Sequence, residues 1–375
     1  MWDQLPELIL TQIFGHLGRE DRANVAQVCQ PWNRALSSPV LWRSVTVLID
    51  RDLRGDFPLA GELAAKYGQH MRSLELAWSR PYILPREARI TRNIQAEAGA
   101  DFLMVVRAMN VQLRKLILTD WIFSCKWGNR GKLLYALANF LGYLRLLCRF
   151  RALTVLRLDY PALSDQTLNA LANAAPKMLK TLHISVRDSD SRQHTIADTA
   201  WHNLAIVCPE LTVSYTIVNI SHYEDMCYLL LPSVPLARFQ MFSGHVWDQS
   251  RSRNFRSTVG LLIAHYTDTL AEVMLQLRNN RELLDDLLIA MLVRCKHLTR
   301  LQYDGIIRSL DTLRDICQLQ AESKTRFRTI HVNPRNVNAR NRAVLNDINY
   351  HYDHKMMEQG VDFRIEDSAS VLLFY

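Results

Sequence analysis

The sequence predicts an α/β protein in which a short helical unit precedes an array of parallel strands with helices between them. In residues 5–42, apolar side chains recur three or four positions apart, the spacing of one face of a helix. From about residue 70 onward a short pattern recurs in which the first, fourth and sixth positions are apolar. Stretches with helical patterning separate several of the copies, so we expect strand-and-helix units that stack along the chain.

The N-terminal unit carries three groups of apolar residues, and a polar break at residues 18–21 separates the first two groups. Two short amphipathic helices and a third helix near Val40 fit this arrangement. About forty residues form a poor independent core, so we expect the apolar stripe to bury itself against something else. The groups are Leu5, Ile9, Ile13, Phe14 and Leu17; Val25, Val28, Cys29 and Trp32; and Leu41 and Trp42.

The order of these residues resembles the F-box in identity and spacing. The matching positions are Leu5-Pro6, Ile13-Phe14, Leu17, Val28-Cys29, Trp32 and Leu41-Trp42. The resemblance implies a three-helix F-box over residues 1–48 that binds the Skp adaptor of cullin-RING ubiquitin ligases. The adaptor-binding residues that it implies are Leu5, Pro6, Ile9, Ile13, Phe14, Leu17, Val25, Val28, Cys29, Trp32, Leu41 and Trp42. The alternative is an ordinary helical hairpin that packs on the rest of the protein.

Three residues depart from the F-box pattern. Leu8 stands where an acidic residue is common, and Arg22 stands where a leucine usually follows the aspartate. We expect both departures to weaken the affinity for the adaptor. Pro31 directly precedes Trp32, and we expect it to end the second helix early, because proline disfavours helix in the residue before it.

The recurring pattern predicts an irregular leucine-rich-repeat solenoid over residues 49–335, with parallel strands on a concave face and helices outside. We expect helices over residues 164–174, 198–207 and 281–294. The asparagine or cysteine that usually follows the strand is missing, since Pro161 and Arg187 hold that place in two of the best copies. The copies begin at Met71, Leu113, Leu153, Leu179, Leu211, Leu236, Leu270, Leu298 and Phe327.

Two cysteines mark individual repeats. Cys208 and Cys295 each stand three residues before the first strand leucine. This placement resembles the cysteine-containing repeats of many F-box proteins, which implies structural thiols at the helix-to-strand turn. The whole layout, and the tail over residues 283–375 most of all, is similar to the group of F-box only proteins 33 and 39.

Residues 336–375 depart from the repeat pattern and are expected to form a C-terminal cap, because a solenoid needs an atypical terminal unit. We expect one helix over residues 340–357, with Leu345 and Ile348 facing inward, and two short strands at residues 363–365 and 371–374. The alternative is a free apolar tail that acts as a peptide ligand.

The residues between the inward leucines of each strand are expected to point to the concave face. Aromatic residues and arginine dominate binding hot spots, so we expect a protein substrate to contact Arg157, Tyr215, Arg238, Phe242 and Arg300. The loop over residues 247–256 is a second candidate surface. The alternative is that these side chains are merely solvated or that Tyr215 and Phe242 pack under a loop.

The sequence gives little indication of catalysis. It contains no glycine-rich phosphate loop and no nucleophile-elbow motif, and His351, Asp353 and His354 lack an evident third metal ligand. The adjacent carboxylates Asp285-Asp286 and Glu224-Asp225 point in different directions if they are helical. We therefore expect a non-enzyme with no catalytic residue, no cofactor and no metal.

Composition sets wider limits. The chain has 375 residues, 49% of them hydrophobic, which is enough for a large core. The formal charge of +8 is distributed along the chain, so an acidic or phosphorylated protein is a better expected partner than nucleic acid. Seven cysteines without a Cys-x-x-Cys pair indicate reduced thiols, and no apolar run reaches the length of a membrane span. We expect an intracellular protein of the cytoplasm and/or nucleus.

The sequence thus predicts the substrate-recognition subunit of a Skp-cullin-F-box ubiquitin ligase. The F-box would bind the adaptor, the repeats would bind the substrate, and cullin and RING proteins would join through the adaptor. Acceleration would come from effective concentration, with the transfer chemistry performed by other chains. One alternative is an F-box scaffold that does not direct ubiquitin transfer, and another is a nucleic-acid-binding repeat protein.

Overall fold

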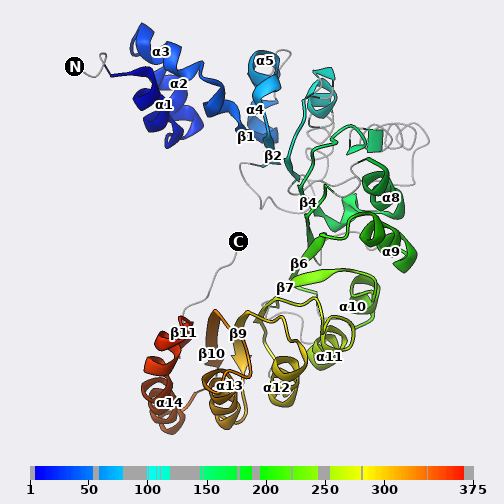
Figure 1. The fold of residues 1–375 in the computed structure, drawn as a ribbon, viewed down its shortest axis with the longest axis vertical. Helices are drawn as coiled ribbons and strands as arrows, with labels where there is room; N and C mark the ends of the chain where they lie inside the picture. Colours follow the sequence, from blue (N-terminus) through cyan, green and yellow to red (C-terminus); the bar gives the residue numbers. More distant parts are fainter. Residues whose placement is uncertain are drawn as a thin grey trace. The chain divides into compact units, whose positions relative to one another are not determined.

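The computed structural model describes residues 5–53, 59–78, 99, 101–106, 108–109, 111–118, 144–145, 147–174, 178–187, 195–220, 223–243, 254–279, 282–335 and 337–366 (Figure 1). The chain forms two compact units. The first comprises Met1–Ala162 with Asn169–Leu179, and the second comprises Leu163–Leu168 with Lys180–Tyr375. Both units contain parallel strands and helices, which confirms the predicted α/β class.

The first unit begins with the predicted three helices, α1 (Glu7–Gly15), α2 (Arg19–Val25) and α3 (Gln30–Leu36), which are followed by the 3-10 helix η2 (Pro39–Trp42). The expectation for Pro31 is wrong. Helix α2 has already ended at Val25, and Pro31 stands in the first turn of α3. That position suits proline, because the amide that proline lacks would have no partner within the helix there.

The same unit continues into four parallel strands that pair in chain order. Only the first strand has no counterpart among the predicted repeats. The strands are β1 (Ser44–Leu48), β2 (Ser73–Ala77), β3 (Lys115–Leu118) and β4 (Val155–Asp159). This unit also contains the helices α4 (Ile49–Asp52) and α5 (Leu59–Tyr67), the 3-10 helices η3 (Gly68–His70) and η4 (Tyr160–Ala162), and helical residues at 101–106.

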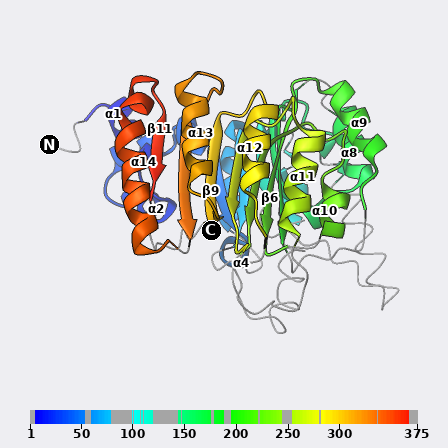
Figure 2. The ribbon, with the colours of Figure 1, turned by 90° about the horizontal axis from the view of Figure 1, so that it is seen from below.

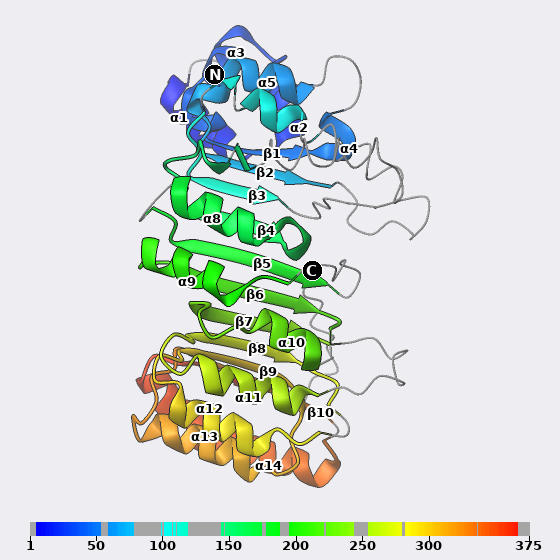
Figure 3. The same cartoon turned by 90° about the vertical axis from the view of Figure 1, so that its right-hand side faces the viewer.

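The second unit is a parallel sheet whose strands also pair in chain order (Figure 3). Its strands are β5 (Thr181–Arg187), β6 (Thr212–Val218), β7 (Leu236–Phe242), β8 (Glu272–Gln276), β9 (Arg300–Ile306), β10 (Thr329–Arg335) and β11 (Asp362–Ile365). Its helices are α8 (Asp165–Ala174), which is divided between the two units, α9 (Asp198–Val207), α10 (Tyr223–Leu229), α11 (Phe255–His265), α12 (Asp285–Arg294), α13 (Asp311–Ala321) and α14 (Ala339–Glu358).

In the second unit, helices α10 to α14 lie along one face of the sheet (Figures 1 and 2). We call the other face of β5–β11 the open face, because no helix of the described residues covers it. Each of the nine predicted repeat starts leads into a strand, β2 to β10. The expected helices at residues 164–174 and 198–207 are α8 and α9, and α12 occupies the later part of residues 281–294.

The predicted inward and outward faces are reversed in β6. Tyr215 was expected on the concave face, but it is only 1% exposed and lies opposite Ile184 and Phe239 of the neighbouring strands. The pairing of β6 with β7 shifts register between Val213 and Ser214. The pairing with β5 has no such shift, but Val213 stands two residues after Leu211, whereas Leu182 stands three residues after Leu179. The alternation in β6 is therefore offset by one residue, which exchanges the two faces of the strand. Tyr215 is therefore a core residue, and its expected role in substrate contact is wrong.

Asn279 follows a repeat strand, the place where the repeats were expected to lack the usual asparagine. The side chain of Asn279, after β8, is 2% exposed and donates to the carbonyls of Glu282 (2.9 Å) and Ile306 (3.1 Å). Its amide oxygen accepts from the backbone N–H of Ile306 at 2.8 Å. Gly305 passes so close that a Cβ there would lie 2.9 Å from this oxygen. Asn279 thus satisfies the loop backbone at the end of β9.

Three helices of the second unit begin with an aspartate that accepts hydrogen bonds from a following loop. We call Asp165, Asp198 and Asp285 the helix-start aspartates. Asp165 accepts from the backbone N–H of Ala197 at 2.9 Å, and Asp198 accepts from that of Ser233 at 2.9 Å. Asp285 accepts from Arg308 (3.0 Å) and from the residue after it. A carboxylate also suits the positive end of a helix dipole, so each aspartate stabilises its own helix and the next connection.

The two marked cysteines lie where they were expected. Cys208 and Cys295 follow the last residues of α9 and α12 and are buried. The carbonyl of each accepts a hydrogen bond from the first strand leucine, Leu211 at 3.0 Å and Leu298 at 3.1 Å. Burial, and secondarily the charge of Asp268, raise the pKa of the Cys295 thiol to about 11. These contacts confirm two structural thiols at helix-to-strand turns.

The C-terminal segment contains the expected helix, α14, with Leu345 and Ile348 buried against the rest of the unit. Strand β11 matches the first expected terminal strand, whereas residues 371–374 lie outside the described residues. His354 is exposed and its Nδ1 lies 3.4 Å from Glu358. Within the described residues, no three His, Cys, Asp or Glu side chains are grouped so that they could hold a metal ion.

Candidate functional site

Two of the twelve expected adaptor contacts lie inside the helical unit. Phe14 is 2% exposed and Leu41 is 5% exposed, and both pack with Leu10, Ala35 and Leu36. The helices are short, so these side chains are needed to fill the small core between them. Phe14 and Leu41 therefore stabilise the unit and are not exposed to a partner, which corrects the expectation for these two residues.

Six more of the expected residues are partly covered. Trp32 meets the Phe14 ring edge-on, with centroids 5.5 Å apart. Trp42 stacks on Tyr67 at 4.4 Å, and its indole N–H donates to the carbonyl of Leu36 at 2.7 Å. Cys29 is half-buried at the start of α3. The other partly buried side chains packed against this core are Leu5, Leu17 and Val25.

The four remaining residues are exposed apolar side chains. Pro6, Ile9 and Ile13 are spaced three and four residues apart, so they lie on one face of α1. Ile9 and Ile13 are each 40% exposed, and Val28, between α2 and α3, is 61% exposed. Large apolar side chains that a folded unit leaves in water typically mark a binding surface when they are grouped. We call Pro6, Ile9, Ile13 and Val28 the exposed apolar set.

Leu8 belongs to a different side of α1. It is 69% exposed and lines a groove of about 640 Å³ together with Gln12, Val40 and Arg43. The sequence singled out Leu8 only as a departure from the F-box pattern. In the structure it extends the exposed apolar surface of the unit, because Val40 across the groove is also exposed.

Arg22, the other departure, holds three elements together. Its guanidinium donates to the carbonyls of Phe14 (3.0 Å), Gly15 (3.2 Å) and Leu41 (2.9 Å). The carbonyls of Phe14 and Gly15 are at the end of α1, where backbone acceptors have no partner within the helix. Burial lowers the pKa of Arg22 from its usual range, although arginine stays charged. The structure thus gives Arg22 a capping role.

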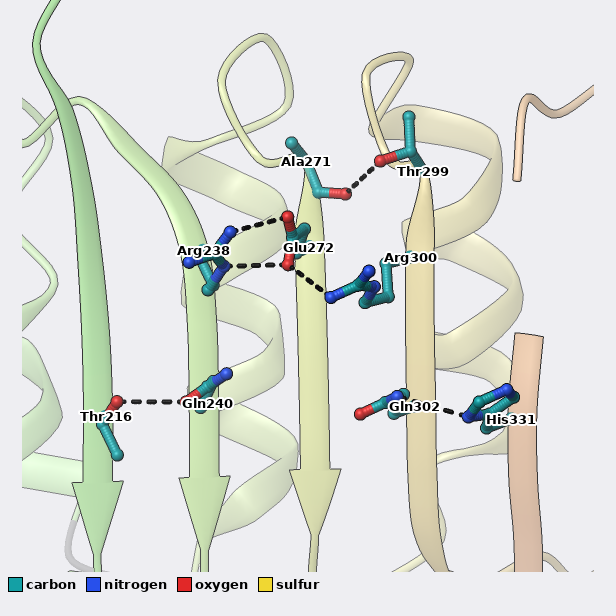
Figure 4. A network of polar contacts seen from close by, with 9 residues as sticks. All are labelled: Thr216, Arg238, Gln240, Ala271, Glu272, Thr299, Arg300, Gln302 and His331. Atoms are coloured by element: carbon teal, nitrogen blue, oxygen red, sulfur yellow. Dashed lines mark hydrogen bonds and ion pairs between the residues drawn. The ribbon is translucent and has the colours of Figure 1, made fainter. Parts of the chain in front are cut away.

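The open face of the second unit carries the charged candidates (Figure 4). Arg238 of β7 donates two hydrogen bonds of 2.8 Å to Glu272 of β8, and Arg300 of β9 lies 3.3 Å from the same carboxylate. The hydrogen bonds from Arg238 hold the pKa of Glu272 below its usual range, and both arginine charges act in the same direction. Glu272 organises the two arginines, a role that the alternating pattern alone could not indicate.

Further polar side chains of the open face bond to one another. Thr216 donates to Gln240 at 3.1 Å, and Gln302 lies 3.3 Å from the ring of His331 (Figure 4). The other ring nitrogen of His331 lies 2.8 Å from Asp362. The open face is therefore a polar, pre-ordered surface of cross-strand pairs.

The other expected contacts have mixed outcomes. Phe242, at the end of β7, is half-buried on the open face. Arg157 is exposed on β4, which belongs to the first unit, so the structure does not place it with the four residues of the second unit. Residues 247–253 of the expected loop lie outside the described residues. Arg256 donates to the carbonyl of Leu283 at 2.8 Å and pairs with Asp286, which ties α11 to α12.

Comparison with known protein families identifies the class of the helical unit. Residues 2–47 match the model of an F-box-like domain. The exposed apolar set and the Leu8 groove both lie within this match.

Curated relatives cover most of the chain. F-box/LRR-repeat protein 8 from Bos taurus is 25% identical over 352 residues, covering 82% of this chain and 90% of the relative. The Homo sapiens protein of the same name is 26% identical over 277 residues, 63% of this chain and 74% of the relative. F-box/LRR-repeat protein 21 from Bos taurus is 24% identical over 342 residues, which cover 80% of this chain and 76% of the relative. The chain thus has an F-box-like domain and is homologous to F-box/LRR-repeat proteins, and these matches give no support to a grouping with F-box only proteins 33 and 39.

None of the helices in the described residues combines the length with the apolar character that crossing a bilayer requires.

Proposed function

We propose that this chain is the substrate-recognition subunit of a Skp-cullin-F-box ubiquitin ligase. The observation that carries the proposal is the exposed apolar set on a segment that matches the F-box-like model. The unit already has its own core, so these side chains are available to a partner. An adaptor with a complementary apolar surface would remove them from water, which is the main favourable term in association.

In this proposal the chain performs no transfer chemistry. The F-box-like domain binds the Skp adaptor, and the adaptor brings the cullin and RING proteins. The repeats hold a protein substrate near the ubiquitin-loaded enzyme, and the rate rises through effective concentration. The expected intracellular location, cytoplasm and/or nucleus, belongs to the same proposal.

The open face is the surface that we propose for the substrate. Arg300 is 47% exposed and shares Glu272 with Arg238, so part of its guanidinium remains available to a carboxylate or carbonyl of a partner. Glu272 keeps the two arginines in place before binding, which reduces the ordering that a substrate must impose. Arg238, Arg300 and Phe242 remain the candidates in this unit, with Glu272 as their positioning residue.

Co-purification of the full chain with the Skp adaptor tests the proposal. The variant Ile9→Ser with Ile13→Ser removes two exposed apolar side chains from one face of α1 and leaves the core intact. We expect adaptor capture to fall by at least tenfold, because such anchors typically contribute more than 1 kcal/mol each.

The matched control is Ile206→Ser with Val293→Ser, which changes two apolar residues of α9 and α12 that are more exposed than Ile9 and Ile13. It should leave capture unchanged. Equal capture by the two double variants, with circular dichroism showing both to be folded, would contradict the proposed docking surface. Capture without any substrate whose lifetime depends on the chain would favour the scaffold function.

A further inference from the structure

A second cavity of the first unit has a composition that adaptor docking does not explain. It encloses about 350 Å³ and is lined by Pro39, Arg43, His70, Arg72 and Arg114. Three of these five residues are arginines, and no carboxylate is among the described residues that line it. We call this cavity the arginine pocket.

The register of the sheet brings the three arginines together. Each stands directly before a strand, and the following residues Ser44, Ser73 and Lys115 are paired across β1, β2 and β3. Neighbouring strands lie about 4.8 Å apart, so the three arginine backbones form a row about 10 Å long. The sequence alone could not reveal this row, because its members are separated by 29 and 42 positions.

The backbone of the row is fixed by hydrogen bonds. The carbonyl of Arg43 accepts from the N–H of Arg72 at 2.9 Å, and the carbonyl of Arg72 accepts from the N–H of Arg114 at 2.7 Å. The carbonyl of Arg114 accepts in turn from the N–H of Thr154 at 2.8 Å. The arginine side chains therefore start from set positions, and a ligand would have to order only their outer parts.

Two of the three guanidinium groups have no hydrogen-bond partner among the described residues. Arg72 donates to the carbonyls of Gln69 (3.0 Å) and Met71 (2.8 Å), which fixes its side chain beside the pocket. Arg43 and Arg114 are exposed, and neither side chain bonds to any other residue in the part of the chain that the structure describes. Like charges on neighbouring strands repel each other, so the row is destabilising by itself.

The second unit has no such row at the same position. The residue before β5 is Lys180, whose ammonium lies 2.8 Å from Glu210, leucine, proline, alanine and threonine precede β6 to β9, and Arg328 stands alone before β10. Three basic residues on neighbouring strands therefore do not follow from repeat construction. An anionic ligand would supply the missing counter-charge.

We propose that the arginine pocket binds a phosphate group. Guanidinium groups match phosphate oxygens with pairs of parallel hydrogen bonds, and a phosphate monoester carries close to two negative charges at neutral pH. Three arginines around one hollow suit such a compact dianion better than a single carboxylate. The volume leaves room for the group to which the phosphate is attached, so it comes either from a small phosphate compound or from a phosphorylated protein side chain. The proposal does not rest on adaptor docking, although Arg43 also lines the Leu8 groove.

Isothermal titration of the full chain at constant ionic strength tests the proposal. The probes are inorganic phosphate, pyrophosphate, and a phosphoserine peptide with its unphosphorylated twin. The test variant is Arg43→Gln with Arg114→Gln, and Arg72 is kept because it also supports the η3 turn. The control is Arg328→Gln, which removes an exposed arginine that precedes β10 in the second unit.

We expect the test variant to bind the phosphate probes at least tenfold more weakly than the intact chain, and the control to bind them within twofold of it. Tighter binding of the phosphopeptide than of inorganic phosphate would identify a protein source, and comparable binding would identify a small compound. No measurable binding by the intact chain, or equal binding by the test variant and the control, would overturn the proposal. Circular dichroism and adaptor capture show separately whether the variants are folded and whether docking is affected.

Discussion

Replacing Arg22 with leucine, the residue type that the F-box resemblance favours there, should destabilise the first unit and should not strengthen adaptor capture. The leucine cannot replace three hydrogen bonds to the carbonyls of Phe14, Gly15 and Leu41. Two of these carbonyls end α1, so the loss falls on the helix that carries Ile9 and Ile13.

The expected loss of stability in Arg22→Leu follows from the three hydrogen bonds. Each hydrogen bond from a charged donor contributes about 1.5–3 kcal/mol, and half-exposed ones fall below that range. Three partly exposed bonds at roughly 1 kcal/mol each, less some gain from burying leucine, leave a net loss of about 2–3 kcal/mol. In a unit of this size, 1 kcal/mol shifts the melting temperature by about 2–4 °C, so a decrease of about 4–12 °C is expected.

Differential scanning calorimetry of the full chain measures this change, with Arg34→Leu as the control. Arg34 is an exposed arginine of α3 in the same segment, so its replacement alters charge and apolar area equally without removing a cap. Arg22→Leu with an unchanged melting temperature and tighter adaptor capture would refute the reasoning. Arg22 would then be a defect of the interface.

Three further predictions follow from other contacts. Glu272→Gln should lower stability at neutral pH, because Arg238 depresses the Glu272 pKa. The Glu272 carboxylate contributes fully to folding stability above its ordinary pKa of 4.5, and this contribution is lost as the pH falls through the depressed value. The urea unfolding curves of the variant and the native chain should therefore converge in acid. Gly305→Ala should cost about 1–3 kcal/mol in urea unfolding, because the added Cβ would overlap neighbouring polar atoms. Ellman's reagent should label exposed Cys148 quickly and Cys295 only on unfolding; rapid labelling of Cys295 would contradict its burial.

The positions of the strands could be predicted from the sequence because their signal is local. Each start, such as Leu179 or Leu298, combines an apolar triplet with a preceding turn, and the sheet repeats that arrangement. The face of a strand also depends on its partner. In β6 the strand begins one residue sooner after Leu211 than the repeat pattern predicts, so Tyr215 lies opposite Ile184 of β5 and faces the core.

The candidate surfaces were likewise predictable from the sequence only in their location, not in the role of each residue. The F-box resemblance identified the helical unit, but it could not separate Phe14, which fills the core, from Ile13, which faces water. Adjacent residues of one short helix differ only by the direction of the side chain. Arg22 and the arginine row depend on contacts between distant segments, so their roles became visible only with the structure.

The helix-start aspartates have a consequence for how chains of this kind diverge. They bond each helix to the connection that follows at the helix side of the sheet, so the linkage between successive repeats does not depend on the side chains of the open face. Exposed pairs such as Arg300 with Glu272 typically contribute no more than about 1 kcal/mol to folding. Partner specificity and cooperative folding therefore reside in separate sets of residues. A lineage can exchange the recognition residues one at a time while the scaffold keeps its integrity.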